Sequence, residues 1–140
     1  MAAMAQFGAR LAAVLELGDV VALSGGLGAG KTTLARAILA GTGYSGEVPS
    51  PTFTLMEFYD PPATQLPVIH ADLYRLKSVD EVEELGLTDL RASAAMLVEW
   101  PERASGFAGD ASRLGIELRH EGEGRIALLQ RGANWRGREF

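Results

Sequence analysis

The chain has 140 residues, of which 47% are hydrophobic and 22% charged, and its formal net charge is −5. This composition predicts one soluble domain, residues 1–140, with a single core, no membrane association and a cytoplasmic location. The lack of cysteine excludes disulfides, thiolate catalysis and Cys-ligated zinc, and the acidic balance disfavours a surface that grips nucleic acid broadly.

An α-β-α pattern is predicted for the N-terminal part. Residues 3–15 are rich in Ala and Leu but are interrupted by polar side chains, which favours an amphipathic helix over a signal peptide. Residues 20–24 form a short apolar run that suits a buried strand, and residues 31–40 show helical spacing before Gly41. A glycine-rich turn joins this strand to this helix.

That turn, residues 25–32, matches G-x-x-x-x-G-K-[ST], the phosphate-binding loop of P-loop NTPases. In this setting backbone N–H groups and a helix N-terminus cradle polyphosphate. Lys31 would reach the β- and γ-phosphates, and the Thr32 hydroxyl would bind Mg²⁺. Lys31 and Lys77 are the only lysines of the chain, whose other basic residues are Arg. The predicted nucleotide contacts here are Gly26, Leu27, Gly28, Ala29, Gly30, Lys31, Thr32 and Thr33.

A turn-rich connection, residues 41–51, follows the predicted helix and leads to a strand over residues 53–59. Thr52, in Ser50-Pro51-Thr52, has two interpretations. It could sense the γ-phosphate and Mg²⁺, as switch threonines of GTPases do, or it could belong to a Pro-defined turn.

Two further apolar strands are predicted, residues 67–72 and 94–99, and each ends in a carboxylate. In an open α/β sheet Asp72 and Glu99 would both emerge at the carboxyl ends of the strands, so we expect at least one to serve the metal. His70 could orient a carboxylate or a water, although such a group is more often simply a satisfied polar side chain. Trp100 could lie near the nucleotide or only pack.

The remaining elements are a helix and a hairpin. Ser78 and Glu81 form a capping box that starts a helix running to Leu85 and stopping at Gly86. Residues 116–120 and 125–130 are predicted to pair as a C-terminal antiparallel hairpin. Residues 131–138 carry basic side chains around a Trp, and we interpret them as a frayed polar tail rather than as a phosphate or partner contact. The pattern as a whole predicts an α/β fold with a mainly parallel sheet.

Four segments give the chain a resemblance to the TsaE family of small bacterial P-loop ATPases. They are Leu-Gly-Ala-Gly-Lys-Thr-Thr at 27–33, Ser-Pro-Thr-Phe-Thr-Leu at 50–55, His-Ala-Asp-Leu-Tyr-Arg-Leu at 70–76 and Leu-Val-Glu-Trp-Pro at 97–101. The resemblance implies a P-loop NTPase-like three-layer fold with a mixed sheet. It also implies Mg²⁺ held by Thr32 and Glu99, an essential Asp72, a switch role for Thr52 and a nucleotide contact from Arg125. Gly26 departs from the Asp that is usual there.

The same resemblance implies a slow ATPase that acts with TsaB and TsaD homologues and meets tRNA through that complex. ATP turnover would reset the complex between rounds of threonylcarbamoyladenosine formation. Two alternatives remain at this stage, a small-molecule P-loop kinase and an adaptor that binds ATP without hydrolysing it. A kinase of the nucleotide or shikimate type would need an acceptor pocket and usually a helical lid.

Overall fold

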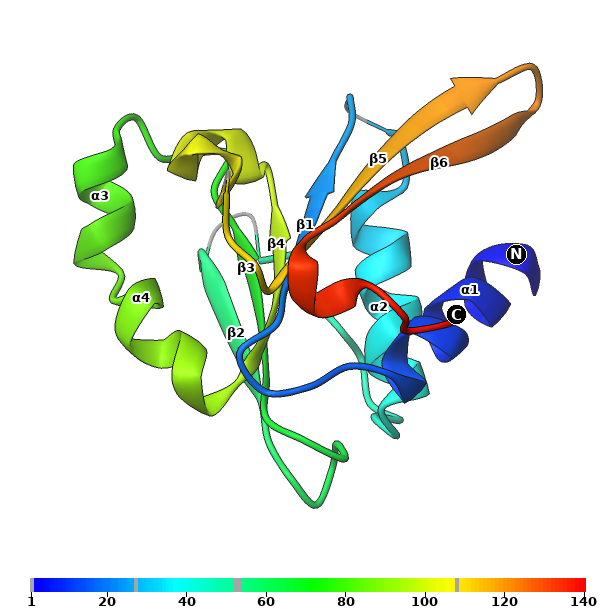
Figure 1. Cartoon of the computed structure of the whole chain (residues 1–140), viewed down its shortest axis with the longest axis horizontal. Coiled ribbons are helices and arrows are strands. Elements are labelled where there is room, and N and C mark those ends of the chain that lie inside the picture. Colours follow the sequence, from blue (N-terminus) through cyan, green and yellow to red (C-terminus); the bar gives the residue numbers. More distant parts are fainter. Residues whose placement is uncertain (1, 27, 52–53, 108) are drawn as a thin grey trace.

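The computed structural model describes residues 2–26, 28–51, 54–107 and 109–140, and a six-stranded sheet lies at its centre (Figure 1). The strands follow the order β2-β3-β4-β1-β5-β6. The four central strands, β3, β4, β1 and β5, run parallel, whereas β2 pairs antiparallel with β3 and β6 with β5. The predicted mixed, mainly parallel sheet with a C-terminal antiparallel hairpin is therefore confirmed. The bounds are β1 (Val20–Ser24), β2 (Met56–Tyr59), β3 (Val68–Asp72), β4 (Ala95–Glu99), β5 (Arg113–Glu121) and β6 (Gly124–Arg131).

Helices cover both faces of the sheet. α1 (Ala2–Ala13) and α2 (Lys31–Gly41) lie on one face, and α3 (Val79–Glu84) and α4 (Leu87–Leu90) lie on the other (Figure 1). Because side chains alternate along a strand, neighbouring residues of β1 enter different cores: Val21 joins the cluster that includes α2, and Val20 the cluster that includes Leu87 of α4. Three short 3₁₀ segments, Arg91–Ser93, Pro101–Phe107 and Ala133–Trp135, complete the fold.

α1 packs unusually close to α2. A Cβ added to Gly8 would lie 2.5 Å from the Cβ of Ala37, so only glycine permits this approach. This contact fixes α1 against α2, so that the first turns of α1 lie beside the glycine-rich loop, residues 25–32. Within the described part of the chain, no helix is long and apolar enough to cross a membrane.

Two predicted boundaries are wrong. The strand expected from residue 53 starts at Met56, because Leu55 has φ 70° and its N–H donates to the Pro51 carbonyl at 2.7 Å, which closes a turn; Phe53 itself lies outside the described residues. The helix expected to run to Leu85 ends at Glu84, and after Gly86 (φ 76°) the chain forms α4, which was not predicted.

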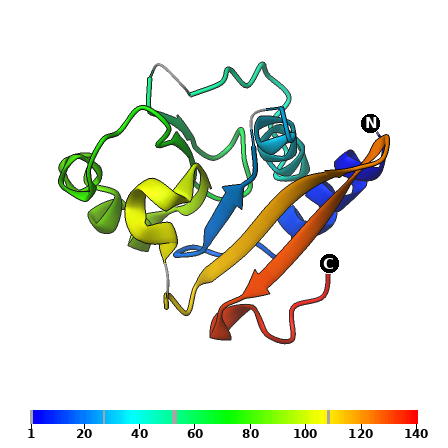
Figure 2. The same cartoon turned by 90° about the horizontal axis from the view of Figure 1, so that it is seen from above.

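The prediction of a frayed C-terminal tail is also wrong. Trp135 is fully buried, and its Nε1–H donates to the Ser112 carbonyl at 2.8 Å. The ring of Phe140 packs against those of Phe7 and Trp135, with centroids 6.0 and 5.9 Å away. Figure 2 accordingly shows the C-terminus on the α1 side of the sheet. The tail is part of the core because Trp135 belongs to the buried cluster on the α1–α2 side of the sheet and Phe140 packs against that cluster.

Candidate functional site

The glycine-rich loop joins β1 to α2 in the way that the sequence predicted. Gly25 adopts φ 137°, and a Cβ there would lie 2.5 Å from the Leu118 carbonyl oxygen, so this position requires glycine. Gly30, at φ 104°, immediately precedes α2. The loop thus aims the first N–H groups of α2 into the space above the sheet, which is a favourable place for an anion.

Two carboxylates lie beside this helix start. Asp72 ends β3 and Glu99 ends β4, and the two residues are direct partners in the parallel register. The Thr32 hydroxyl donates to Glu99 Oε1 at 2.8 Å, whereas Asp72 Oδ1 accepts from the Tyr74 N–H at 2.9 Å. Both carboxylates are almost completely buried, with 4% of Asp72 and 2% of Glu99 exposed. A hydroxyl and two carboxylates from three different segments therefore converge at one point.

Lys31 is held over the same point. Its ammonium donates to the carbonyls of Gly25 and Gly26 at 2.7 and 2.9 Å and lies 4.3 Å from the ring centroid of Trp100. Burial lowers the pKa of Lys31 from its ordinary value, and the negative charge of Glu99 is the largest of the effects that oppose this shift. The site thus combines a desolvated cation with nearby anions.

A cavity of about 290 Å³ lies between these groups. Its walls are formed by residues of the glycine-rich loop, α2, the ends of β3 and β4, and the start of β6. Arg125 of β6 reaches across to donate to the Gly28 carbonyl at 3.1 Å. The lining residues are Gly28, Gly30, Lys31, Thr32, Thr33, Asp72, Glu99, Trp100 and Arg125.

All nine lining residues are among those predicted from the sequence, and two other predicted residues that the structure describes, Gly26 and Ala29, are not in the lining. Gly26 contributes its carbonyl to Lys31, and Ala29 is buried in the core. Leu27 and Thr52 lie outside the described residues. The binding and catalytic roles assigned to all these residues stay predictions.

The donor set of the cavity suits a hard cation that shares its ligands with phosphate. Mg²⁺ usually takes one or two carboxylates together with substrate oxygens and waters, and seldom has a cage made only of protein groups. Thr32 and Glu99 offer one hydroxyl and one carboxylate that already touch. Within the described ranges, no three His, Asp or Glu side chains form a metal cluster.

The sequence did not predict that α1 contributes to the surroundings of this site. A Cβ placed on Gly30 would lie 3.3 Å from Met4 Cε and 3.5 Å from Arg125 Nε, so both side chains lie over the loop. Beside them a second cavity, of about 430 Å³, lies between α1 and the hairpin, and Phe7 and Ile126 are among its lining residues. The only signal in the sequence was the amphipathic pattern of residues 3–15, which does not say what the helix faces.

Comparison with known proteins gives one consistent result. The family model of "Threonylcarbamoyl adenosine biosynthesis protein TsaE" matches residues 1–127. A relative from Streptomyces coelicolor, the tRNA threonylcarbamoyladenosine biosynthesis protein TsaE, is 41% identical over 116 residues, which are 81% of this chain and 78% of the relative. The protein of the same name from Haemophilus influenzae is 40% identical over 117 residues, 79% of this chain and 73% of its own. Among solved structures, Bacillus subtilis YdiB matches with a TM-score of 0.70 at 27% identity, covering 95% of this chain and 82% of YdiB.

Proposed function

This chain belongs to the TsaE family, whose members serve tRNA threonylcarbamoyladenosine biosynthesis, and on that premise we propose that it is a MgATP-dependent ATPase of this pathway. Its turnover resets a complex of TsaB and TsaD homologues between rounds of modification. The protein works in the cytoplasm and meets tRNA through that complex.

The observation that carries the proposal is the contact between Thr32 and Glu99. The hydroxyl that follows the loop lysine lies 2.8 Å from a buried carboxylate at the end of the neighbouring strand. In P-loop NTPases these two positions hold Mg²⁺ against the β- and γ-phosphates. A hydrogen bond with only a structural role would not require a carboxylate as the acceptor. Here the carboxylate lies beside the buried ammonium of Lys31 and at the N-terminus of a helix, where the first N–H groups have no partner within the helix.

The orientation that we propose for the nucleotide rests on two neighbouring cavities. Lys31, Thr32 and Glu99 receive the β- and γ-phosphates. Arg125 lines this cavity and also the mainly apolar cavity next to α1. The ribose and base therefore extend toward α1 and the hairpin, where apolar side chains suit an aromatic ring.

In the proposed reaction the protein acts mainly by placing charged groups around the phosphates, rather than by forming covalent bonds. Mg²⁺ held by Thr32 and Glu99 would neutralise charge that develops on the phosphate oxygens. Lys31 exchanges two loop carbonyls for phosphate oxygens, and since its ammonium is already desolvated this exchange costs little. Asp72, in register with Glu99, orients a water at the γ-phosphate, and Thr52 is the switch residue that responds to that phosphate.

Lys31→Ala tests nucleotide binding directly. We expect ATP affinity to fall by about 1.5–3 kcal/mol, the value of a charge-assisted contact, in calorimetry with excess Mg²⁺. Lys77→Ala is the matched control, because Lys77 is exposed and is the other lysine of the chain. Equal ATP affinity in the two variants would contradict the assignment of Lys31 to nucleotide binding.

Reconstitution tests the pathway role. Repeated rounds of tRNA adenosine modification by TsaB and TsaD homologues should need this protein and should stop with Lys31→Ala. Hydrolysis that releases free phosphate separates the proposal from a non-hydrolysing adaptor, and transfer to a metabolite would favour a kinase. The two helices described between β3 and β4 have six and four residues, which is short for the lid of such a kinase.

A further inference from the structure

His70 lies directly behind the proposed magnesium site. It is on β3, two residues before Asp72, and its side chain is fully buried. Its Nε2 atom lies 2.6 Å from Glu99 Oε2, while Thr32 binds the other oxygen, Oε1. Each oxygen of Glu99 therefore has its own protein partner, one from β3 and one from α2.

We propose that His70 is the positioning residue of this site, and the inference rests on the MgATP function proposed above. His70 donates Nε2–H to Oε2 of Glu99 and so reserves Oε1 for Thr32 and the cation. His70 touches neither nucleotide nor metal. It acts through the orientation that it gives to the Glu99 carboxylate.

The tautomer of His70 follows from its two partners. An ionised carboxylate only accepts hydrogen bonds, so the ring nitrogen that faces Glu99 must carry a proton. The other ring nitrogen, Nδ1, is buried and has no hydrogen-bond partner among the described residues. A proton on Nδ1 would be a buried donor without an acceptor, which proteins avoid. The contacts therefore favour a proton on Nε2, the ring nitrogen that faces Glu99.

The position of Glu99 explains why such a partner is needed. Glu99 is the last residue of β4, and the next residue, Trp100, turns the chain away with φ 57°. The Glu99 side chain must still point back toward the start of α2. In a buried site an unpartnered carboxylate oxygen is costly, and the carboxylate could rotate to pair Oε1 elsewhere. Hydrogen-bond partners outside the first ligand shell commonly fix metal ligands in this way.

Two variants of His70 separate positioning from packing. The amide nitrogen of Gln can reach the place of Nε2, whereas that of Asn stops near the place of Nδ1. His70→Gln therefore keeps a donor for Glu99, and His70→Asn removes it. The measurement is the Mg²⁺ concentration needed for ATP binding, followed by the fluorescence of Trp100, together with the ADP affinity in the absence of Mg²⁺.

We expect His70→Asn to raise the required Mg²⁺ concentration by about 10–100-fold, and His70→Gln by much less. ADP affinity without Mg²⁺ should stay at the wild-type value in both variants, because the loop itself is intact. If the role of His70 were purely structural, the required Mg²⁺ concentration would rise and the ADP affinity without Mg²⁺ would fall together. NMR of ¹⁵N-labelled histidine in the wild-type protein should show the proton of His70 on Nε2.

Each other outcome has a definite meaning. If His70→Asn needs no more Mg²⁺ than the wild type while Glu99→Gln does, the role of His70 is wrong and the proposed function stands. If Glu99→Gln also leaves the Mg²⁺ requirement unchanged, the magnesium site itself is wrong. If His70→Asn does not fold, His70→Leu takes its place as the variant without a donor. The inference then requires that His70→Leu needs more Mg²⁺ for ATP binding than the wild type, and that the wild-type His70 carries its proton on Nε2. A proton found on Nδ1 overturns the inference.

Discussion

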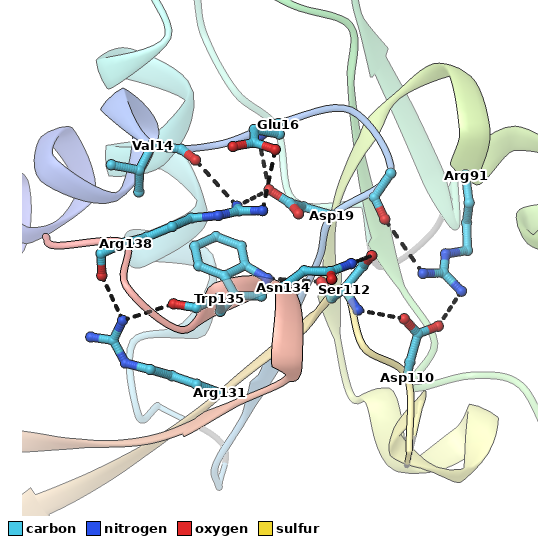
Figure 3. Close-up of polar contacts among 11 residues, drawn as sticks. Val14, Glu16, Asp19, Arg91, Asp110, Ser112, Arg131, Asn134, Trp135 and Arg138 are labelled. Carbon is cyan, nitrogen blue, oxygen red and sulfur yellow. Dashed lines mark hydrogen bonds and ion pairs between the residues drawn. The ribbon is translucent and has the colours of Figure 1, made fainter.

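At the carboxyl ends of the parallel strands Lys31, Thr32, Asp72 and Glu99 surround a cavity, whereas at the amino ends Arg91 pairs with Asp110 and Arg138 with Asp19 (Figure 3). Both ends use Asp, Glu and basic side chains, and both bury some of them. The difference lies in how the polar groups are arranged.

At the amino ends two ion pairs join segments that are distant in the chain. Arg138 Nη1 donates to Asp19 Oδ2 at 2.7 Å, and Arg91 pairs with Asp110. The Arg91 guanidinium holds the pKa of Asp110 below its ordinary value, whereas burial raises the pKa of Asp19 despite Arg138. These pairs attach the C-terminal segment and the turn before β5 to the body of the sheet (Figure 3).

At the carboxyl ends the charges are gathered around the cavity instead. Lys31 donates to two backbone carbonyls and lies beside Trp100, although three carboxylates are close enough to influence its pKa. The backbone takes up a left-handed conformation at Trp100, next to Glu99. Strain and crowded charge of this kind are typical of sites that act on a ligand, whereas satisfied pairs are typical of stabilising contacts.

The largest expected effect is a loss of stability at the amino ends. Arg138→Ala should lower the free energy of unfolding by about 3 kcal/mol, because Asp19 stays buried without its guanidinium partner. Chemical denaturation at neutral pH measures this change. Arg136→Ala, at an exposed arginine two residues away, should change stability by less than about 0.5 kcal/mol. Equal effects of the two substitutions would mean that the tail does not depend on this pair.

The same variant should depend on pH in a defined direction. The pKa of Asp19 is already raised by burial, and the loss of Arg138 removes its hydrogen bond and its charge, which oppose the shift. A carboxyl group with a raised folded pKa favours the folded state below its unfolded pKa, and this advantage disappears as pH rises through the folded pKa. The cost of Arg138→Ala should therefore shrink as pH falls from 7 toward the ordinary pKa of 3.8. A cost that stays constant over this range would contradict the burial of the Asp19 charge.

Glu99→Gln should show the opposite behaviour at the carboxyl ends, with a loss of activity that is much larger than its loss of stability. The amide keeps the shape and can still accept from Thr32, but it removes the charge that faces the cation. We expect Mg²⁺-dependent ATP hydrolysis to fall by about 100-fold, which corresponds to about 2.7 kcal/mol. Glu102→Gln removes the same charge from an exposed position three residues on and should keep activity. Normal hydrolysis by Glu99→Gln would leave Asp72 as the metal carboxylate.

The sequence predicted the carboxyl ends far better than the amino ends. The loop, its helix and the strand-terminal Asp72 and Glu99 form a local pattern of strand, turn and helix start, so their meeting point follows from parallel strand order. The pairs at the amino ends join residues that lie far apart in the chain, such as Asp19 and Arg138. No local signal marks Trp135 as buried, since its surroundings in the sequence are polar and basic.

The smallest expected effect concerns two glycines of the loop that differ in backbone conformation alone. A Cβ at either Gly26 or Gly28 would meet no described atom within 4 Å, but Gly28 has φ 76° and Gly26 lies outside the left-handed region. Gly26→Ala should therefore raise the free energy of unfolding by about 0.4–1 kcal/mol, because it removes freedom only from the unfolded chain. Gly28→Ala should lower that free energy by about 1 kcal/mol, since alanine must adopt a left-handed conformation.

Urea denaturation of both variants without nucleotide measures this difference, and the m-value should stay the same. The family resemblance implies an Asp at position 26, and the open space around Gly26 is consistent with a side chain there. Gly26→Ala should also tighten ADP binding slightly, since a stiffer loop loses less entropy when it closes on phosphate. If both alanine variants lose stability equally, the flexibility at Gly26 is itself required by the loop, and the glycine at this position is more than a neutral departure from the family.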